Sequence, residues 1–257
     1  MMISAVVLAK NEERNIKECL AGLAWSNEIV VIDDYSDDQT VGVIRGIREI
    51  EGKTKIFQRR LNGNFSQQRN FGLEKTKGEW VLFVDADERV SERLKEEIKL
   101  AMASDKNIDS FFFRRIDFFL GKWLKHGEIG SVRILRLAKK GKGRWKRKVD
   151  ETWEVDGPTR TFVNPLLHFP HPSLADFLTS INERSTLNAQ EAFEEKVRVS
   201  FLDWFKPLAK FLLNYFFRAG FLDESQGFIF AVLMSFHSFL VRGKLYLLRH
   251  QDISKQK

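Results

Sequence analysis

Two carboxylates stand at alternate positions directly after an apolar run in this chain. Trp80–Val84 has the composition of a buried strand, and Asp85 and Asp87 follow it. Ligands of open α/β sheets bind at the carboxyl ends of the strands, and Mg²⁺ or Mn²⁺ favours carboxylate, water and substrate phosphate oxygens. The pair therefore predicts a divalent metal site for a diphosphate-bearing substrate. Taken alone, the same residues also fit a solvated turn before a helix that begins near Ser91.

Acidic and amide side chains also follow the first two apolar runs. Asn11 and Glu12 come after the first run, and Asp33 and Asp34 end the second. Carboxylates at neighbouring strand ends can accept hydrogen bonds from ribose hydroxyls or from a base N–H. The sequence has no Gly-x-Gly-x-x-Gly or Gly-Lys-Thr loop beside them, so the dinucleotide-binding and P-loop interpretations fail.

Alternating strand and helix patterns must position these side chains. We expect strands at Ile3–Leu8, Glu28–Asp33, Thr54–Gln58 and Trp80–Val84. Apolar residues recur at helical spacing between the first two strands and again after the fourth. This alternation predicts an α/β fold with a mostly parallel sheet flanked by helices.

The middle of the chain has a different pattern. Ser110–Phe113 and Ile116–Leu120 predict extended structure. Ser131–Leu137 and Arg144–Lys148 flank a glycine-containing basic turn, which predicts that they pair as a hairpin.

The carboxyl-terminal part is predicted to be helical. Ser173 begins a capping-box pattern for a helix that would run to about Lys196. We therefore expect a sheet domain over residues 1–172 and a helical region over residues 173–257.

This helical region is strongly aromatic. Ten of the 23 phenylalanines lie between Phe201 and Phe239. The apolar stretch Phe228–Val241 is too short for a comfortable membrane span. Helices that lie on a membrane surface fit better, and packing against the sheet domain or a second subunit is the alternative.

Composition sets the broad class. The 257 residues are 43% hydrophobic, enough for a substantial core, and the net charge of +7 with a pI near 9.4 favours anionic partners. A single cysteine, Cys19, excludes an internal disulfide framework, and no signal peptide pattern begins the sequence. We expect a protein of the reducing cytoplasm.

Taken in order, the acidic strand ends resemble the motifs of the family 2 inverting glycosyltransferases. That family has Asn-Glu after strand one, Val-Asp-Asp-x-Ser-x-Asp-x-Thr after strand two, and then a metal-binding Asp-x-Asp. This chain has Asn11-Glu12, the sequence DDYSDDQT at residues 33–40, and Asp85-Ala86-Asp87. Arg69-Asn70-Phe71-Gly72 resembles the Arg-Asn-x-Gly segment of the family.

Further segments resemble the lipopolysaccharide core glucosyltransferase branch, the WaaE/KdtX-like proteins. They are FLGKW at 119–123, HG at 126–127, LRL at 135–137, VDGP at 155–158, NPLLH at 164–168 and GFLD at 220–223. The resemblance therefore extends over nearly the whole chain.

The resemblance implies a fold and a set of site residues. The fold would be of the GT-A, Rossmann-like type with a helical appendage at the carboxyl end. The nucleotide sugar would be bound by Asn11, Glu12, Asp33, Asp34, Arg69 and Asp85. Mg²⁺ or Mn²⁺ would be held by Asp85, Asp87 and His168. An exposed helix cation remains the alternative for Arg69, and a structural role the alternative for His168.

An inverting transfer also needs a general base for the acceptor hydroxyl. The branch commonly reads Val-His-Glu at the expected place, whereas this chain reads Val149-Asp150-Glu151. We assign the base to Glu151 with Asp150 as the second candidate. Solvated carboxylates without a catalytic role are the alternative.

The resemblance implies two substrates. The donor would be a nucleotide sugar, namely UDP-glucose, and the acceptor a lipopolysaccharide core or another glycolipid or saccharide. A membrane surface is a further expected partner, with the protein peripheral on the inner face of the cell membrane, and nucleic acid is not expected. Non-catalytic binding of a nucleotide sugar or membrane partner stays open, as does, with less support, a sugar-phosphate nucleotidyltransferase.

Overall fold

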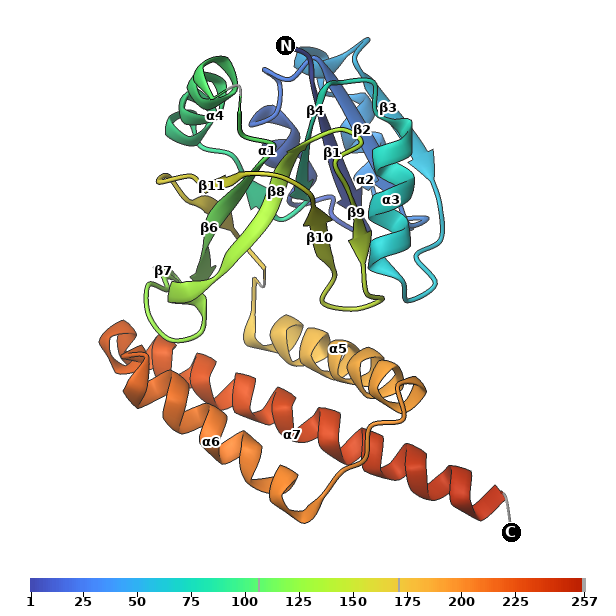
Figure 1. Ribbon diagram of the computed structural model, residues 1–257, viewed down its shortest axis with the longest axis vertical. Helices are drawn as coiled ribbons and strands as arrows, with labels where there is room; N and C mark the ends of the chain where they lie inside the picture. Colours follow the sequence, from blue (N-terminus) through green and yellow to red (C-terminus); the bar gives the residue numbers. More distant parts are fainter. Residues whose placement is uncertain (106, 171, 256–257) are drawn as a thin grey trace. The chain divides into compact units, whose positions relative to one another are not determined.

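The computed structural model describes residues 1–105, 107–170 and 172–255, with side chains described up to residue 251. The chain forms two compact units (Figure 1). The sheet unit comprises Met1–Arg115 and Arg133–Phe169, and the helical unit comprises Ile116–Val132 and Pro170–Lys257. The segment Ile116–Val132 thus belongs to the helical unit, because Phe119 packs there in a cluster with Phe177 and Phe230.

The predicted parallel strands form the centre of the sheet unit. They are β1 (Ile3–Ala9), β2 (Glu28–Asp33), β3 (Thr54–Gln58) and β4 (Trp80–Asp85), which pair in parallel in the order β3-β2-β1-β4. Each begins at its predicted residue and ends within one residue of its predicted end. The parallel pairing brings the carboxyl ends of β1, β2 and β4 to one edge of the sheet (Figure 1).

Antiparallel strands continue the sheet beyond β4. The strand β8 (Arg133–Lys139) pairs with β4, and β6 (Ser110–Phe119) pairs with β8. The two extended segments expected within residues 110–120 form this single strand, which has an irregularity between Phe111 and Phe112. Shorter strands complete the sheet: β5 (Glu88–Arg89), β7 (Lys122–Trp123), β11 (Thr159–Thr161) and β12 (Leu166–His168).

Helices cover both faces of the sheet. They are α1 (Ile16–Ala21), α2 (Thr40–Arg45), α3 (Phe65–Lys75) and α4 (Glu92–Ser104), with short 3₁₀ helices η1 (Arg48–Ile50) and η2 (Ile129–Ser131). Alternate residues of each central strand face opposite sides, so Val7 packs with α1, α2 and α4, whereas Val6 packs with α3. The Ser91 side chain caps α4 by accepting a hydrogen bond from Leu94 N at 3.3 Å.

The predicted hairpin of Ser131–Leu137 with Arg144–Lys148 is wrong. The strand β9 (Gly143–Lys146) pairs instead with β10 (Thr152–Val155) in a separate two-stranded sheet. Trp145 and Trp153 stand opposite each other in this pair, stack at 5.3 Å between ring centroids, and pack edge-on against Phe83 of β4. Burial of these three rings outweighs the local turn signal that favoured pairing with β8.

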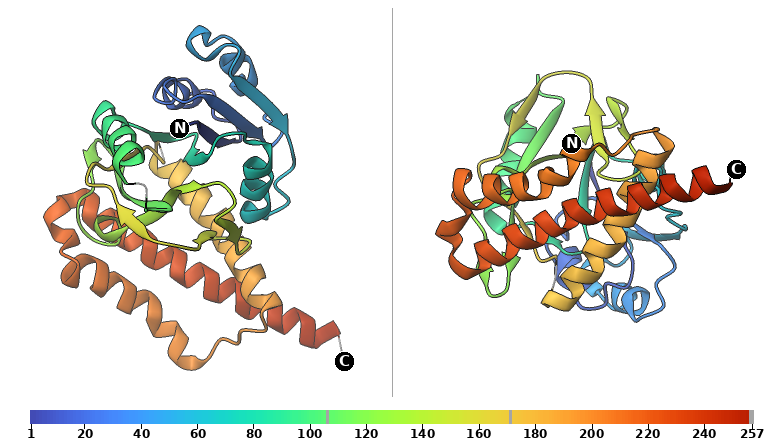
Figure 2. Two further views of the ribbon diagram at one scale, coloured as in Figure 1. Left: turned by 45° about the horizontal axis from the view of Figure 1, so that its top comes forward. Right: turned by 90° about the horizontal axis from the view of Figure 1, so that it is seen from below.

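The helical unit consists of α5 (Leu174–Glu194) and an antiparallel helical hairpin. The first arm of the hairpin contains η3 (Phe201–Phe205), α6 (Lys206–Leu212) and the π-helical turn η4 (Leu213–Phe217). The turn η5 (Gly220–Asp223) leads into α7 (Glu224–Lys255), which forms the second arm (Figures 1 and 2). Ser173 caps α5 by accepting a hydrogen bond from Asp176 N at 3.1 Å, as its capping pattern predicts.

The helix α7 is longer than the apolar stretch Phe228–Val241 that it contains, because it continues beyond Val241 through a second apolar group around Leu245. By length and composition, the helical segment Gly220–Gln251 is long enough and apolar enough to cross a membrane. In its most apolar 18-residue stretch, 28% is buried inside the protein. That this region lies on a membrane surface rather than crossing the membrane stays a prediction.

Candidate active site

The loops after β1 and β2 are joined by hydrogen bonds. Lys10 Nζ donates to the carbonyl oxygens of Asp34 and Tyr35, each at 2.8 Å. Asn11 Oδ1 accepts from Asp37 N at 3.0 Å. Since Asn11 and Tyr35 both have left-handed backbone conformations, these contacts stabilise two sharply bent loops at the sheet edge.

Asp33 and Asp34 help to shape this edge. The buried Asp33 carboxylate accepts from Ser36 Oγ at 2.5 Å and from Gln58 Nε2 at 3.1 Å. Asp34 Oδ1 accepts from Leu61 N at 2.9 Å. Their hydrogen bonds, like those of Asn11, lie among the loops rather than in the charged cluster described next.

A cluster of buried charges lies at the end of β4. Arg69, on α3 and only 3% exposed, donates from Nη2 to Asp85 Oδ1 at 2.8 Å. Arg136, on β8, donates from Nη2 to Asp85 Oδ2 at 2.6 Å. Both guanidinium groups lie against the Trp145 ring, at 4.7 and 5.8 Å from its centroid. The helix-cation alternative for Arg69 is therefore wrong, because its side chain points into the protein.

This pairing sets the ionisation of the cluster. Burial alone would raise the pKa of Asp85, but Arg136 and Arg69 together hold that pKa well below its ordinary value. Glu88 is fully buried, accepts from Asp85 N at 2.9 Å and lies 3.5 Å from Arg136 Nη2. Burial raises the pKa of Glu88 despite that arginine. Asp85 is thus a fixed anion, whereas Glu88 is the carboxyl in the cluster that takes up a proton more readily.

Arg69 also connects the cluster to Glu151. Its Nε donates to Glu151 Oε1 at 2.7 Å, and the Glu151 side chain is 14% exposed. Asp150 is exposed and has a left-handed backbone with φ of 49°. The structure therefore brings Glu151 into contact with the cluster through Arg69.

Asp87 and His168 meet through strand pairing. The strands β5 and β12 place His168 opposite Glu88, and His168 Nε2 lies 3.2 Å from Asp87 Oδ2. Burial would raise the pKa of Asp87, but the adjacent imidazole lowers it below its ordinary value.

The ionised carboxylate of Asp87 is a ligand type that suits Mn²⁺ or Mg²⁺. Among the residues that the structure describes, no group of three or more His, Cys, Asp or Glu side chains is arranged to enclose a metal ion. A partial set of this kind fits ions that keep water and substrate phosphates as ligands. Asp85 is held by two arginines at 2.8 and 2.6 Å, whereas Asp87 lies 3.2 Å from His168, so Asp87 is the better first ligand.

Glu12 faces the same edge. Its Oε2 accepts from Asn15 Nδ2 at 2.8 Å, and Asn15 Oδ1 in turn accepts from Arg89 Nη2 at 3.1 Å. Burial and then the neighbouring Asp87 charge raise the pKa of Glu12 to about 7. The carboxylate therefore gains or loses its proton near neutral pH.

Sequence reasoning missed the roles of three residues in this site. Arg136 occurs in the Leu-Arg-Leu segment, but nothing local shows that its side chain reaches Asp85. Glu88 follows the Asp-x-Asp motif directly, and Trp145 is an apolar residue between basic neighbours. For Trp145 the available sequence signal was a tryptophan between two basic residues, Arg144 and Lys146.

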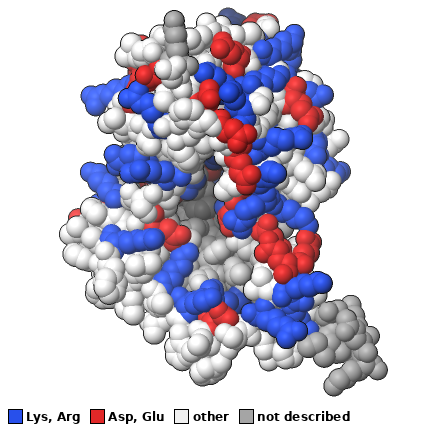
Figure 3. All heavy atoms as spheres, in the orientation of Figure 1, with Lys and Arg blue, Asp and Glu red and all other residues white. Residues whose placement is uncertain are grey.

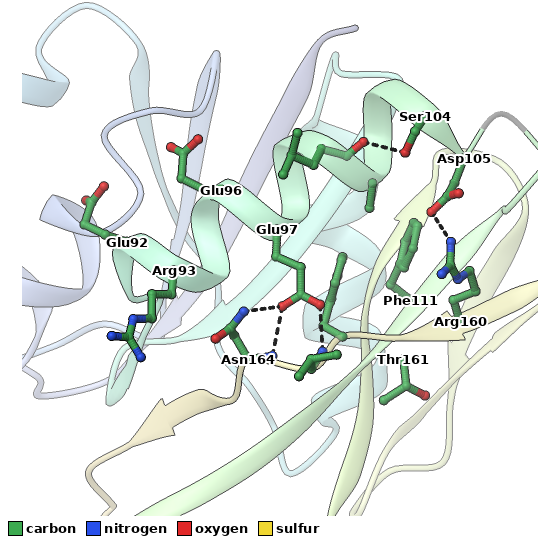
Figure 4. Close-up of a pocket in the computed structure, with 14 residues that line it drawn as sticks. Glu92, Arg93, Glu96, Glu97, Ser104, Asp105, Phe111, Arg160, Thr161 and Asn164 are labelled. Carbon is green, nitrogen blue, oxygen red and sulfur yellow. Dashed lines mark hydrogen bonds and ion pairs between the residues drawn. The ribbon is translucent and has the colours of Figure 1, made fainter.

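A separate hollow lies on the outer side of the sheet unit, between α4 and β11 (Figure 4). Glu97 anchors one side of it by accepting from Val163 N at 2.7 Å and from Asn164 Nδ2 at 2.7 Å. Arg160 and Asp105 pair across another part. No residue predicted for the site is among those that line this hollow.

The sequence is similar to known glycosyltransferases. Residues 4–162 match the family model described as Glycosyl transferase family 2. The chain is 28% identical over 248 residues to the lipopolysaccharide core biosynthesis glycosyltransferase LpsC of Rhizobium meliloti (strain 1021), covering 95% of this chain and 92% of LpsC. It is 24% identical over 261 residues to an uncharacterised glycosyltransferase of Rickettsia typhi, covering 95% and 86% of the two chains.

Two solved structures share the fold. Staphylococcus aureus TarS 1-349 in complex with UDP-GlcNAc has a TM-score of 0.52 and 15% identity, covering 98% of this chain and 92% of TarS 1-349. The mannosyltransferase PcManGT of Pyrobaculum calidifontis, in complex with GDP-Man and Mn²⁺, has a TM-score of 0.50 and 15% identity, covering 92% and 73%. At this identity the likeness is one of fold.

Proposed function

This chain belongs to glycosyl transferase family 2 and is a glycosyltransferase of the GT-A fold, and we propose that it is an inverting enzyme of cell-envelope glycan synthesis. The proposed donor is a nucleotide-diphosphate sugar, and the acceptor is a lipopolysaccharide core or a related glycolipid. The observation that carries the proposal is that Arg69 joins Asp85 of the Asp-x-Asp motif to Glu151 in one buried cluster.

The charged residues of this cluster suit the departure of a nucleoside diphosphate. Asp85, Asp87 and His168 would hold Mg²⁺ or Mn²⁺, which when bound neutralises charge on the leaving diphosphate. Asn11, Glu12, Asp33 and Asp34 would bind the nucleoside at the edge formed by β1 and β2. Arg69 fixes Asp85 between its guanidinium and that of Arg136, so the first carboxylate of the motif is in place before any ligand binds.

Inversion requires a single displacement at the anomeric carbon. The acceptor oxygen attacks from the face opposite the diphosphate while a base removes the hydroxyl proton, and the bond from the anomeric carbon to the diphosphate breaks. We assign the base to Glu151, whose carboxylate is oriented by Arg69 Nε at 2.7 Å. Asp150 remains the second candidate, since it replaces the histidine typical of the branch.

Similar proteins guide the choice of substrates. LpsC is named as a lipopolysaccharide core biosynthesis enzyme, which supports an acceptor of that class. TarS was solved with UDP-GlcNAc and PcManGT with GDP-Man and Mn²⁺, which support a nucleotide-sugar donor and a divalent ion. We propose UDP-glucose as the first donor to test, and an enzyme on the cytoplasmic side of the cell membrane.

The test is donor hydrolysis and binding over a panel of UDP-, GDP- and TDP-sugars with Mg²⁺, Mn²⁺ or chelator. We expect saturable binding of one donor and slow metal-dependent release of its nucleoside diphosphate. Glu151→Gln should reduce transfer about 10²- to 10⁴-fold while donor binding persists, whereas Asp150→Asn, the exposed neighbour, should have a much smaller effect. Failure of every donor to bind would contradict the proposed function.

A further inference from the structure

The helical hairpin of the helical unit exposes an aromatic surface. In its first arm Phe201, Leu202 and Phe217 are 77%, 75% and 83% exposed. On α7 the exposed side chains of Phe228, Val232, Phe236 and Phe239 recur at spacings of four, four and three residues, which places them on one stripe of the helix. We call these seven residues the aromatic surface.

The two arms present this surface together. Trp204 of η3 contacts Phe239 and Tyr246 of α7 at ring-centroid distances of 5.9 and 6.1 Å. Nearer the turn, Phe211 of α6 contacts Phe228 at 5.9 Å. The arms therefore lie side by side along their length (Figure 2). Soluble proteins ordinarily expose apolar side chains singly, whereas here they are gathered on two adjacent helices.

The charges around the surface are basic. Neither the segment 204–222 nor the segment 225–251 contains an Asp or Glu. Over residues 198–251 there are seven Lys or Arg and three Asp or Glu, a net charge of +4. Basic side chains lie on both units in Figure 3, so the hairpin differs from the rest of the chain in having few acidic residues, of which Asp203 is paired with Lys206.

The opposite side of α7 is committed to protein packing. Phe230 and Leu233 are buried in a cluster with Phe177 and Ile181 of α5. Lys244 Nζ also donates to α5, to Asn182 Oδ1 at 2.8 Å and to other oxygens of that helix. The α5 helix carries exposed charges such as Glu183, which would be costly to place in hydrocarbon.

We propose that the aromatic surface docks in the interface of an anionic lipid bilayer, with α6 and α7 lying along the membrane rather than crossing it. The phenylalanine rings would insert at the boundary between headgroups and acyl chains, and the lysines and arginines of the two arms would contact anionic headgroups. The net charge of +4 over residues 198–251, with long stretches of both arms free of acidic residues, is the charge complement to an anionic membrane. This proposal does not depend on the proposed function, although it would bring the enzyme to a lipid-linked acceptor.

The test is sedimentation of the full chain with vesicles of phosphatidylcholine alone and of phosphatidylcholine mixed with phosphatidylglycerol. We expect stronger binding to the mixed vesicles, partly reduced by salt. The triple variant Phe201→Ser, Leu202→Ser, Phe217→Ser should bind the mixed vesicles about 10- to 100-fold more weakly. Leu100→Ser with Val163→Ser is the matched control, because these side chains are 69% and 75% exposed on the sheet unit.

A second variant tests the charge argument without removing apolar area. Lys206→Glu with Arg218→Glu, both at exposed positions, should lose the preference for phosphatidylglycerol. Retention of the protein in membranes after alkaline carbonate extraction would instead show that α7 spans. Equal binding by the native chain and the triple variant would overturn the proposal, as would a native dimer that the triple variant converts to a monomer while vesicle binding is absent.

Discussion

Arg136 offers a quantitative test of the buried cluster. In Arg136→Met the guanidinium that lies 2.6 Å from Asp85 and 3.5 Å from Glu88 is replaced by an apolar side chain of similar length. Removing one partner of a buried ion pair typically costs 3–5 kcal/mol. Asp85 keeps its contact with Arg69, so we expect a loss near the lower limit, about 3 kcal/mol at pH 8.

The loss should depend on pH in a defined direction. Burial already raises the pKa of Glu88, and removal of Arg136 raises it further, so the native state of the variant binds that proton more tightly than the unfolded chain does. The variant should therefore lose less stability at pH 5.5 than at pH 8, because a larger fraction of Glu88 is protonated at the lower pH. Adding Glu88→Gln should recover part of the loss at pH 8 and little at pH 5.5.

The assay is urea unfolding followed by tryptophan fluorescence, since Trp145 lies against Arg136. The matched control is Arg133→Met, an exposed arginine on the same strand, which should change the unfolding free energy by less than about 0.5 kcal/mol. A loss in Arg136→Met no larger than in this control, or one that is equal at both pH values, would refute the account of the cluster.

Further predictions concern the site and the core around it. Glu12 has a pKa of about 7 in the folded state, above its ordinary 4.5, so the native chain should lose stability as the pH rises from 5 to 8 in chelator. Glu12→Gln should lack this pH-dependent loss, so its melting temperature should rise relative to that of the native chain as the pH increases from 5 to 8. A difference in melting temperature that is the same at pH 5 and pH 8 would contradict the raised pKa of Glu12. Trp153→Ala should cost about 3–5 kcal/mol in urea unfolding, because it removes a ring packed at 5.0 Å from Phe83 and 5.3 Å from Trp145. A loss of about 0.5 kcal/mol or less, as is typical of surface substitutions, would show that β9 and β10 are not packed as described.

The sequence predicted the parallel part of the fold well because its signals are local. Each of β1 to β4 is an apolar run bounded by polar residues, and the acidic strand ends had to meet once those strands paired in parallel. The capping pattern at Ser173 was sufficient for α5 in the same way. Pairing of β9 with β10 was not predictable, since it depends on Trp145 and Trp153 meeting over Phe83, which comes from a distant part of the chain.

The candidate site was predictable in its carboxylates but not in its cations. Asp85, Asp87 and Glu151 follow recognisable motifs, whereas the contact of Arg136 with Asp85 requires the antiparallel pairing of β8 with β4. The meeting of His168 with Asp87 likewise requires β12 to pair with β5. The roles of Asn11, Asp33 and Asp34 in nucleoside binding stay predictions, because their described hydrogen bonds shape the loops themselves.

The most direct test of the proposed function compares the native chain with Asp87→Asn in metal-dependent donor binding. Isothermal titration of UDP-glucose and the other donors with Mn²⁺, Mg²⁺ or chelator should give saturable binding of one donor to the native chain, dependent on metal and lost in Asp87→Asn. Glu97→Gln, a carboxylate outside the site, should bind like the native chain. Metal-dependent binding by Asp87→Asn that equals binding by the native chain would contradict the assignment of Asp87. The absence of binding to every donor would contradict the transferase mechanism proposed for this site.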